Sequence, residues 1–203
     1  MAQVFVITGP SGVGKGTLIR SLRERIPELQ LSVSATTRPP RPGEEDGVDY
    51  HFLSGADFQR RVDAGDFVEH ATYSGHRYGT LRSELDRRIA AGIPVVLEIE
   101  VQGARQVRRA MPEALQVFIA PPSREALRAR LVGRGTDDPE QVEARLRAAE
   151  EELDAQDEFA CVVVNDRLED AVAELVGIVQ ERVRACREGA QKGGPSGPVT
   201  SKP

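Results

Sequence analysis

The sequence predicts an α/β fold in which helices flank a parallel β-sheet core. The prediction rests on apolar runs at 4–8, 95–101, 116–119 and 161–164, separated by stretches with helical spacing of apolar residues. Near-continuous apolar runs are typical of strands buried on both faces, and strands that alternate with helices form parallel sheets. The 203 residues suit one domain, because a single core stops growing at about 250–300 residues.

The elements follow one another in a regular order. The first strand, Val4–Thr8, runs into a glycine-rich turn and then into a helix from Leu18 to Ile26, which Pro27 ends. Helical spacing of apolar residues predicts four more helices, at 81–89, 127–131, 142–153 and 168–183. This order matches the crossover connections of a parallel sheet.

The segment 32–78 breaks the alternation. It is polar and rich in proline and glycine, and it carries short aromatic or β-branched pieces at 49–53, 67–73 and 76–78. We therefore expect an inserted, mostly antiparallel lobe with one small helix near 56–64.

Two further stretches lack periodicity. Residues 133–138 lie between two arginine-bearing helices and are predicted to form a mobile flap, and 189–203 are predicted to be a disordered tail. We expect a single domain over 1–188. Its predicted parts are core segments at 1–33, 89–126 and 157–188, the inserted lobe at 34–88 and a small mobile lid at 127–156.

Composition narrows the class of protein. The net charge of −5 argues against nucleic-acid binding through a general basic surface, and no apolar run approaches the ~20 residues that a membrane span needs. The N-terminus enters a strand pattern without a signal peptide, and two cysteines, Cys161 and Cys186, suit a reducing compartment. We expect a cytoplasmic protein. The three histidines lack metal-ligand spacing, and packing or exposure is the expected role of His51, His70 and His76.

The glycine-rich turn carries the first chemical motif. Gly9-Pro10-Ser11-Gly12-Val13-Gly14-Lys15 joins the first strand to the first helix, which is the context of a phosphate-binding P-loop. Glycines let backbone N–H groups converge on phosphates, the helix N-terminus adds a favourable dipole, and Lys15 can reach the β- and γ-phosphates. The alternative is an ordinary strand-to-helix turn. A P-loop alone predicts only nucleoside triphosphate binding.

The motif departs from the general pattern after its lysine. Gly16 stands where Ser or Thr is usual, and Thr17 comes one position later. We therefore expect the Mg²⁺ cofactor to be held through phosphates and water, with Thr17 as the alternative protein ligand.

Several further motifs, in order along the chain, resemble the guanylate kinase family. They are Ser34-Ala35-Thr36-Thr37-Arg38-Pro39-Pro40-Arg41-Pro42-Gly43-Glu44, Gly47-Val48-Asp49-Tyr50-His51-Phe52, Phe67-Val68-Glu69, Tyr78-Gly79-Thr80, Glu98-Ile99-Glu100-Val101-Gln102-Gly103, Ile119-Ala120-Pro121-Pro122-Ser123, Arg130-Leu131, Arg134-Gly135 and Val164-Asn165-Asp166. The resemblance covers about 4–183. It implies a P-loop kinase that transfers the γ-phosphoryl group of ATP to GMP, and also to dGMP, in purine nucleotide metabolism and GMP recycling. Neither nucleic acid nor membrane is an implied partner, and monomer and homo-oligomer are both compatible with the sequence.

The resemblance assigns the inserted lobe to GMP. Arg38 and Arg41 suit a phosphate dianion, although a solvated loop is the alternative for these two residues. Glu69 can accept hydrogen bonds from N1–H and the amine of guanine, which leaves the O6 acceptor to the hydroxyls of Ser34 and Thr80. The expected GMP-binding set is Ser34, Arg38, Arg41, Tyr50, Glu69, Tyr78, Gly79, Thr80, Glu98 and Glu100.

The resemblance also assigns the donor side. By the resemblance, Glu98 and Glu100 are expected near GMP and the water shell of the metal ion. The family commonly has Asp at the position of Glu100. The expected ATP-binding set is Gly9, Pro10, Ser11, Gly12, Val13, Gly14, Lys15, Gly16, Thr17, Arg130, Arg134 and Asn165. The expected catalytic set is Lys15, Arg38, Arg130, Arg134 and Arg145. The alternative for the helix arginines is surface ion pairing with nearby glutamates.

Two other functions compete with this enzyme. Guanylate-kinase-like domains also serve as phosphopeptide-binding scaffolds, but these typically lose the P-loop lysine, which is present here as Lys15. A related P-loop kinase with another phosphorylated acceptor is the third hypothesis. Glu69 with Ser34 and Thr80 favours guanine over other bases.

Overall fold

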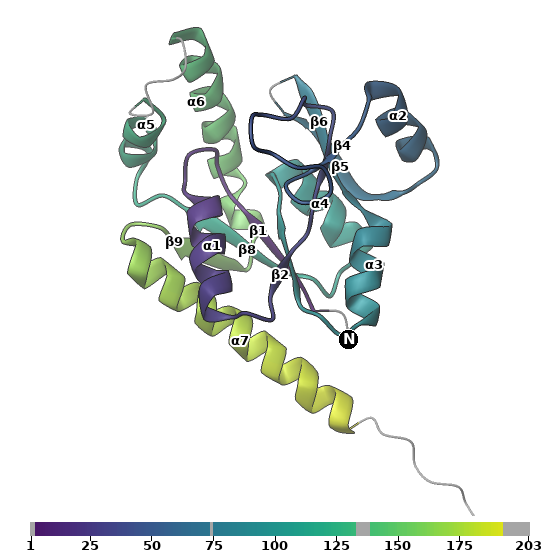
Figure 1. Ribbon diagram of the computed structural model, residues 1–203. Helices are drawn as coiled ribbons and strands as arrows, with labels where there is room; N and C mark the ends of the chain where they lie inside the picture. Colours follow the sequence, from purple (N-terminus) through teal and green to yellow (C-terminus); the bar gives the residue numbers. More distant parts are fainter. Residues whose placement is uncertain (1–2, 74, 133–138, 193–203) are drawn as a thin grey trace, which may run out of the picture.

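The computed structural model describes residues 3–73, 75–132 and 139–192. Within them, one sheet contains five parallel strands in the order β2-β7-β1-β8-β9 (Figure 1). The strands are β1 (Val4–Thr8), β2 (Gln30–Leu31), β7 (Val95–Glu98), β8 (Leu115–Ala120) and β9 (Cys161–Val164). The predicted α/β class with a parallel core is confirmed.

Helices cover both faces of this sheet because its strands are apolar on both sides. Phe5 and Ile7 pack with one group of helices, whereas Val4 and Val6 pack with the other. The first group is α1 (Lys15–Arg25), α5 (Arg124–Val132), α6 (Pro139–Asp154) and α7 (Leu168–Lys192). The second is α3 (Arg82–Ala90) and α4 (Val101–Ala110), and Ala155 and Phe159, which flank a 3-10 turn at Gln156–Glu158, belong to the same core.

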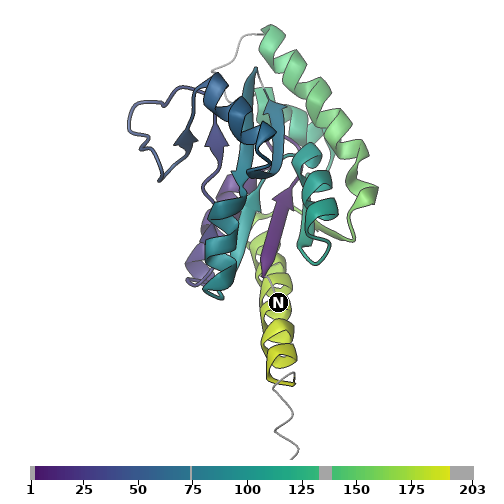
Figure 2. The same cartoon turned by 90° about the vertical axis from the view of Figure 1, so that its right-hand side faces the viewer.

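The inserted lobe has its own sheet, with strand order β4-β3-β6-β5. Its elements are β3 (Ala35–Thr36), β4 (His51–Phe52), α2 (Gly55–Asp63), β5 (Phe67–Tyr73) and β6 (His76–Leu81). Only the β3–β4 pair is parallel among the pairs described, so the mostly antiparallel prediction is confirmed. A small separate core around Phe58 and Phe67, whose rings stack at 4.5 Å, stabilises the lobe. Figure 2 shows the lobe beside the parallel sheet rather than continuous with it.

The predicted strand over 95–101 is wrong at its end. β7 stops at Glu98, and α4, which the sequence analysis missed, begins at Val101. Val101, Ala104 and Val107 recur at helical spacing and are buried against the sheet, but Val101 also extends the apolar run of the strand. The short strand β2 was missed too, since two residues carry no periodicity.

Helix α7 runs further than expected. It continues to Lys192, so residues 189–192 are helical rather than part of the predicted tail, and its C-terminal end extends away from the two sheets (Figures 1 and 2). The remaining tail and the predicted flap at 133–138, with Arg134, lie outside the described residues. Among the described helices, none is long and apolar enough to cross a membrane.

Candidate active site

The P-loop adopts a conformation that requires glycine. Gly9 has φ 139°, and a Cβ there would lie 2.3 Å from the Ile119 carbonyl oxygen of the neighbouring strand β8. Gly14 has φ 101°, and a Cβ there would lie 2.7 Å from Nδ2 of Asn165. The turn therefore packs directly against the ends of β8 and β9, and α1 begins at Lys15 with its N–H groups facing the loop.

Lys15 is held within this turn. Its side chain is buried, and Nζ donates to the Gly9 carbonyl oxygen at 2.5 Å and lies 3.6 Å from Oε2 of Glu100. Oε2 of Glu100 is buried and accepts no hydrogen bond within the described chain. The ammonium group therefore stands between the P-loop backbone and an acid from the start of α4.

Glu98 lies next to the residue that follows the lysine. A Cβ at Gly16 would be 3.7 Å from Oε1 of Glu98, so this carboxylate borders the position of the usual Ser or Thr. The protein atoms around Glu98 displace part of its hydration and so raise its pKa, and the charge of Lys15 offsets part of this rise. The side chain nevertheless remains exposed to solvent. Glu98 ends β7 and Glu100 directly precedes α4, and both line the same pocket.

Two of the predicted arginines contact the P-loop region. Arg130 of α5 donates to the Asn165 carbonyl oxygen at 2.9 Å, and Arg145 of α6 donates to Oγ of Ser11 at 3.2 Å. Asn165, which belongs to the expected ATP-binding set, donates from Nδ2 to the Val13 carbonyl oxygen at 2.8 Å and is buried. Asn165 directly follows β9, which pairs with β8 up to Val164, so its side chain supports the P-loop from the end of the parallel sheet.

A carboxylate that the sequence analysis missed also reaches the P-loop. The backbone N–H of Ser11 donates to Oε2 of Glu152 at 3.1 Å. Burial and the adjacent Glu100 carboxyl raise the pKa of Glu152 well above its ordinary value. Its position seven residues after Arg145 would place both on one face of α6, which is the signal that could have found it.

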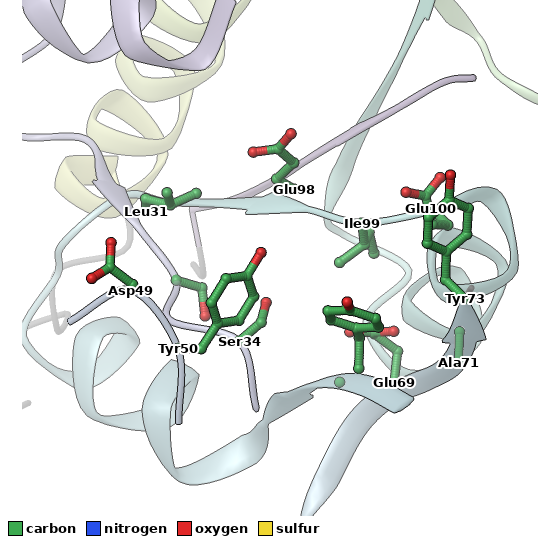
Figure 3. A pocket seen from close by; sticks show the side chains of 13 residues that line it. Leu31, Ser34, Asp49, Tyr50, Glu69, Ala71, Tyr73, Glu98, Ile99 and Glu100 are labelled. Atoms are coloured by element: carbon green, nitrogen blue, oxygen red, sulfur yellow. The ribbon is translucent and has the colours of Figure 1, made fainter. Parts of the chain in front are cut away.

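A cavity of about 290 Å³ lies between the inserted lobe and the C-terminal end of β7. Figure 3 shows Tyr50 and Ser34 across from Glu69, with Glu98 and Glu100 along the border that β7 and α4 provide. The lining contains seven residues that the sequence analysis chose: Ser34, Tyr50, Glu69, Tyr78, Gly79, Glu98 and Glu100. It also contains residues that it missed: Leu31, Ser32, Asp49, Ala71, Tyr73 and Ile99. Ala71 and Tyr73 alternate with Glu69 along β5, so strand periodicity could have found them.

Glu69 is the buried acid of this cavity. Only 4% of it is exposed, and burial raises its pKa to about 7 although Thr80 donates to Oε1 at 2.7 Å. Thr80 is fully buried, and its hydroxyl, the predicted partner of guanine O6, donates to Glu69.

The predicted arginines Arg38 and Arg41 are not among the residues that line the cavity, but Arg38 lies beside Tyr50, which is. Nη2 of Arg38 donates to Glu44 at 2.8 Å, and its guanidinium carbon lies 5.3 Å from the centre of the Tyr50 ring. The rings of Tyr50 and Tyr78 are 6.1 Å apart, and burial raises the pKa of Tyr50. Arg41 is exposed in the same loop, and its backbone N–H donates to Glu44 at 2.7 Å. Glu44 therefore organises both arginines of the loop.

Comparisons with known proteins agree with this geometry. A family model described as guanylate kinase matches residues 1–182. The chain belongs to the guanylate kinase family. It is 57% identical over 174 residues to the guanylate kinase of Frankia casuarinae, covering 86% of this chain and 95% of the relative. It is likewise 57% identical over 175 residues to that of Synechococcus sp., covering 86% and 92%.

A solved guanylate kinase also has the same arrangement. The crystal structure of guanylate kinase from Anaplasma phagocytophilum aligns with a TM-score of 0.72 at 31% identity, covering 92% of this chain and 89% of that chain. The guanylate kinase resemblance drawn from the motifs is thus confirmed over nearly the whole chain.

Proposed function

We propose that this member of the guanylate kinase family transfers the γ-phosphoryl group of ATP to GMP, with dGMP as a second acceptor, to give ADP and GDP. The observation that carries the proposal is the shared border of two sites. Glu100 lies 3.6 Å from the P-loop lysine and also lines the cavity that contains Glu69. A donor phosphate chain on the P-loop would therefore face an acceptor bound in that cavity.

In the acceptor site, Glu69 would read guanine. Its carboxylate can accept from N1–H and the exocyclic amine, and the Ser34 hydroxyl, which lines the same cavity, suits O6. A site built to pair buried polar groups can reject an analogue without them by about 10⁴–10⁵. This supports GMP over AMP as the acceptor.

The phosphate of GMP would bind beside Tyr50, where Arg38 lies. Arg38 and Arg41 supply guanidinium groups, and Tyr50 and Tyr78 supply phenolic donors. The Arg38–Glu44 ion pair at 2.8 Å is compatible with this role, because a phosphate dianion can share or replace the carboxylate. We propose that Arg38 also stabilises the transferred group.

On the donor side, backbone N–H groups of 9–17 would hold the ATP phosphates, with Lys15 moving from Gly9 onto the β- and γ-oxygens. We propose Arg130, Arg134 and Arg145 as further cations over the triphosphate, and Asn165 as the support of the loop that carries it. The acceptor is already a phosphate oxygen, so positioning and charge stabilisation suffice without a general base.

The kinases of this family use a divalent metal ion, and we propose Mg²⁺. Hard oxygen ligands suit this ion, and the Glu98 carboxylate, which borders Gly16 beside Lys15, offers them directly or through water. Thr17, exposed on the first turn of α1, is the alternative protein ligand. When bound, Mg²⁺ would neutralise charge on the phosphate oxygens.

We also propose a division of labour along the chain. The GMP-binding lobe over 34–88 is supported by its separate sheet and core, and the lid over 127–156 by the contacts of Arg130 and Arg145 with the P-loop region. The core is 1–33, 89–126 and 157–188. The two cysteines and the net charge of −5 support a cytoplasmic location and argue against nucleic-acid partners.

A panel of acceptors tests the proposal. With ATP and Mg²⁺, coupled ADP release is measured for GMP, dGMP, AMP, UMP and CMP. GMP should be consumed fastest, and Lys15→Ala should lower its turnover by at least about 10²–10³-fold, since a preorganised charge partner of the transition state is lost. Arg20→Ala, an exposed change on the same helix, is the matched control. Preference for another acceptor, or full turnover by Lys15→Ala, would refute the assignment.

A further inference from the structure

The position of the Glu69 carboxylate depends on what surrounds it. One oxygen, Oε1, accepts from the Thr80 hydroxyl at 2.7 Å, which fixes that end of the group. The other oxygen, Oε2, faces the first turn of α4. The carboxylate therefore lies between Thr80 on strand β6 of the lobe and helix α4 of the core, and its orientation depends on both.

Gly103 provides the space for Oε2. It is buried in the first turn of α4, and a Cβ there would lie 2.5 Å from Oε2 and 3.1 Å from Cδ of Glu69. Real Cβ atoms essentially never approach an oxygen this closely, so one of the two groups would have to move. The same Cβ would make an ordinary van der Waals contact with Cδ1 of Ile99 at 3.4 Å, so the steric conflict is with Glu69.

Helix α4 is held where it is. One turn after Gly103, Gln106 accepts from the His70 backbone N–H at 3.2 Å and donates to the His70 carbonyl oxygen at 2.7 Å. His70 is the residue next to Glu69 on β5, and both hydrogen bonds join the helix to that strand. Because the helix cannot retreat without breaking this pair, an added methyl group at 103 would move the carboxylate instead.

We propose that Gly103 is a positioning residue for guanine discrimination, which acts by leaving room for the Glu69 carboxylate to face the acceptor base. The proposal rests on the proposed function, because Glu69 must be the reader of guanine. It assigns to the start of α4 a part in base selection although Gly103 offers no side chain to the substrate. Its backbone conformation is an ordinary helical one, so helix geometry alone gives no reason for glycine at this place.

The test is Gly103→Ala, assayed with GMP and with IMP, which lacks the exocyclic amine. Charge-assisted hydrogen bonds to the base are weakened, so KM for GMP should rise about 10–100-fold, with much less change for IMP. The ratio of kcat/KM for GMP over IMP should fall accordingly, whereas KM for ATP should stay unchanged. Gly177→Ala in α7, where a Cβ meets nothing within 4 Å, is the matched control and should behave as the parent.

A second background separates positioning from packing. Glu69→Asp withdraws the carboxylate by one methylene, so Gly103→Ala should cost GMP binding far less there than in the parent. An equal penalty in both backgrounds, or an unchanged GMP-to-IMP ratio in folded Gly103→Ala, would overturn the proposal. If Gly103→Ala fails to fold, the Glu69→Asp/Gly103→Ala protein decides: folding restored by the shorter acid supports the clash, and no restoration overturns it. An unchanged KM for GMP in Glu69→Asp alone would instead refute the guanine assignment.

Discussion

At the scale of residues, the site contains acids whose surroundings oppose their charge. Glu69 is 4% exposed and its pKa is raised to about 7, since burial outweighs the hydrogen bond from Thr80. A carboxylate of this kind costs folding free energy when it is ionised without a ligand donor. Guanine would supply two donors to it, so binding of the base and ionisation of Glu69 should reinforce each other.

The raised pKa of Glu69 predicts a pH-dependent cost to stability. The folded-state pKa lies above the unfolded value, so the stabilising effect of the protonated form is complete below pH 4.5 and is lost as the pH rises through about 7. Glu69→Gln should therefore raise the free energy of unfolding by roughly 2–3 kcal/mol at pH 8 and by little at pH 5. Urea unfolding at both pH values measures this, with Glu45→Gln, exposed in the same lobe, as control. An equal effect of Glu69→Gln at the two pH values would contradict the prediction.

The same acid predicts how substrate use varies with pH. A protonated Glu69 loses acceptor capacity for guanine, so KM for GMP should rise as the pH falls from 8 to 6, while KM for ATP follows a different profile. Steady-state kinetics of the parent and of Glu69→Gln provide the comparison. A KM for GMP that varies with pH equally in both proteins would show that another group is responsible.

At the scale of elements, α6 places both charge signs on the P-loop. Arg145 donates to the Ser11 hydroxyl, and Glu152 accepts from the Ser11 backbone N–H at 3.1 Å. A bound phosphate would compete with Glu152 for that N–H but would be attracted to Arg145. The helix should therefore change its contacts with the loop when ATP binds.

This exchange predicts proton release. Burial and the adjacent Glu100 carboxyl raise the pKa of Glu152, and displacement into water would lower it again, so nucleotide binding should release protons. Affinity for a non-hydrolysable ATP analogue should therefore increase as the pH rises from 6 to 8. Calorimetry in buffers of different ionisation enthalpy measures the protons. Glu152→Gln should abolish their release, and the exposed neighbour Glu151→Gln should not.

At the scale of the whole molecule, two sites of different origin share one border. The donor site lies on the parallel sheet and the acceptor site lies largely on the lobe, and they meet where β7 turns into α4. Each nucleotide should thus stabilise the fold through its own site. Ligand at 100 times its Kd adds about 2.7 kcal/mol.

Thermal shifts test this independence. In Lys15→Ala, GMP should raise Tm as it does in the parent, whereas the shift from the ATP analogue should shrink. In Glu69→Gln the pattern should reverse. If either change removed both shifts equally, the two sites would not be separable in this way.

Much of this architecture could be predicted from the sequence. Glycine spacing before Lys15 predicted the P-loop. Near-continuous apolar runs, alternating with segments of helical apolar spacing, predicted the parallel core. The aromatic and proline-rich pieces predicted the lobe. These features depend on residues close together in the chain, whose backbone preferences act locally. The end of strand β7 at Glu98 was not predicted, because Val101 suits a strand and a buried helix face equally.

The sequence by itself therefore determined the class of fold, the phosphate-binding turn and the identity of most residues that line the cavity. Only the tertiary structure decided which partners those residues take: Thr80 holds Glu69, Asn165 supports the P-loop, Gly103 makes room for a carboxylate, and Glu152 reaches Ser11. Ser11 and Glu152 are 141 residues apart in the chain. Contacts over such separations come from packing of whole elements, which no local pattern encodes.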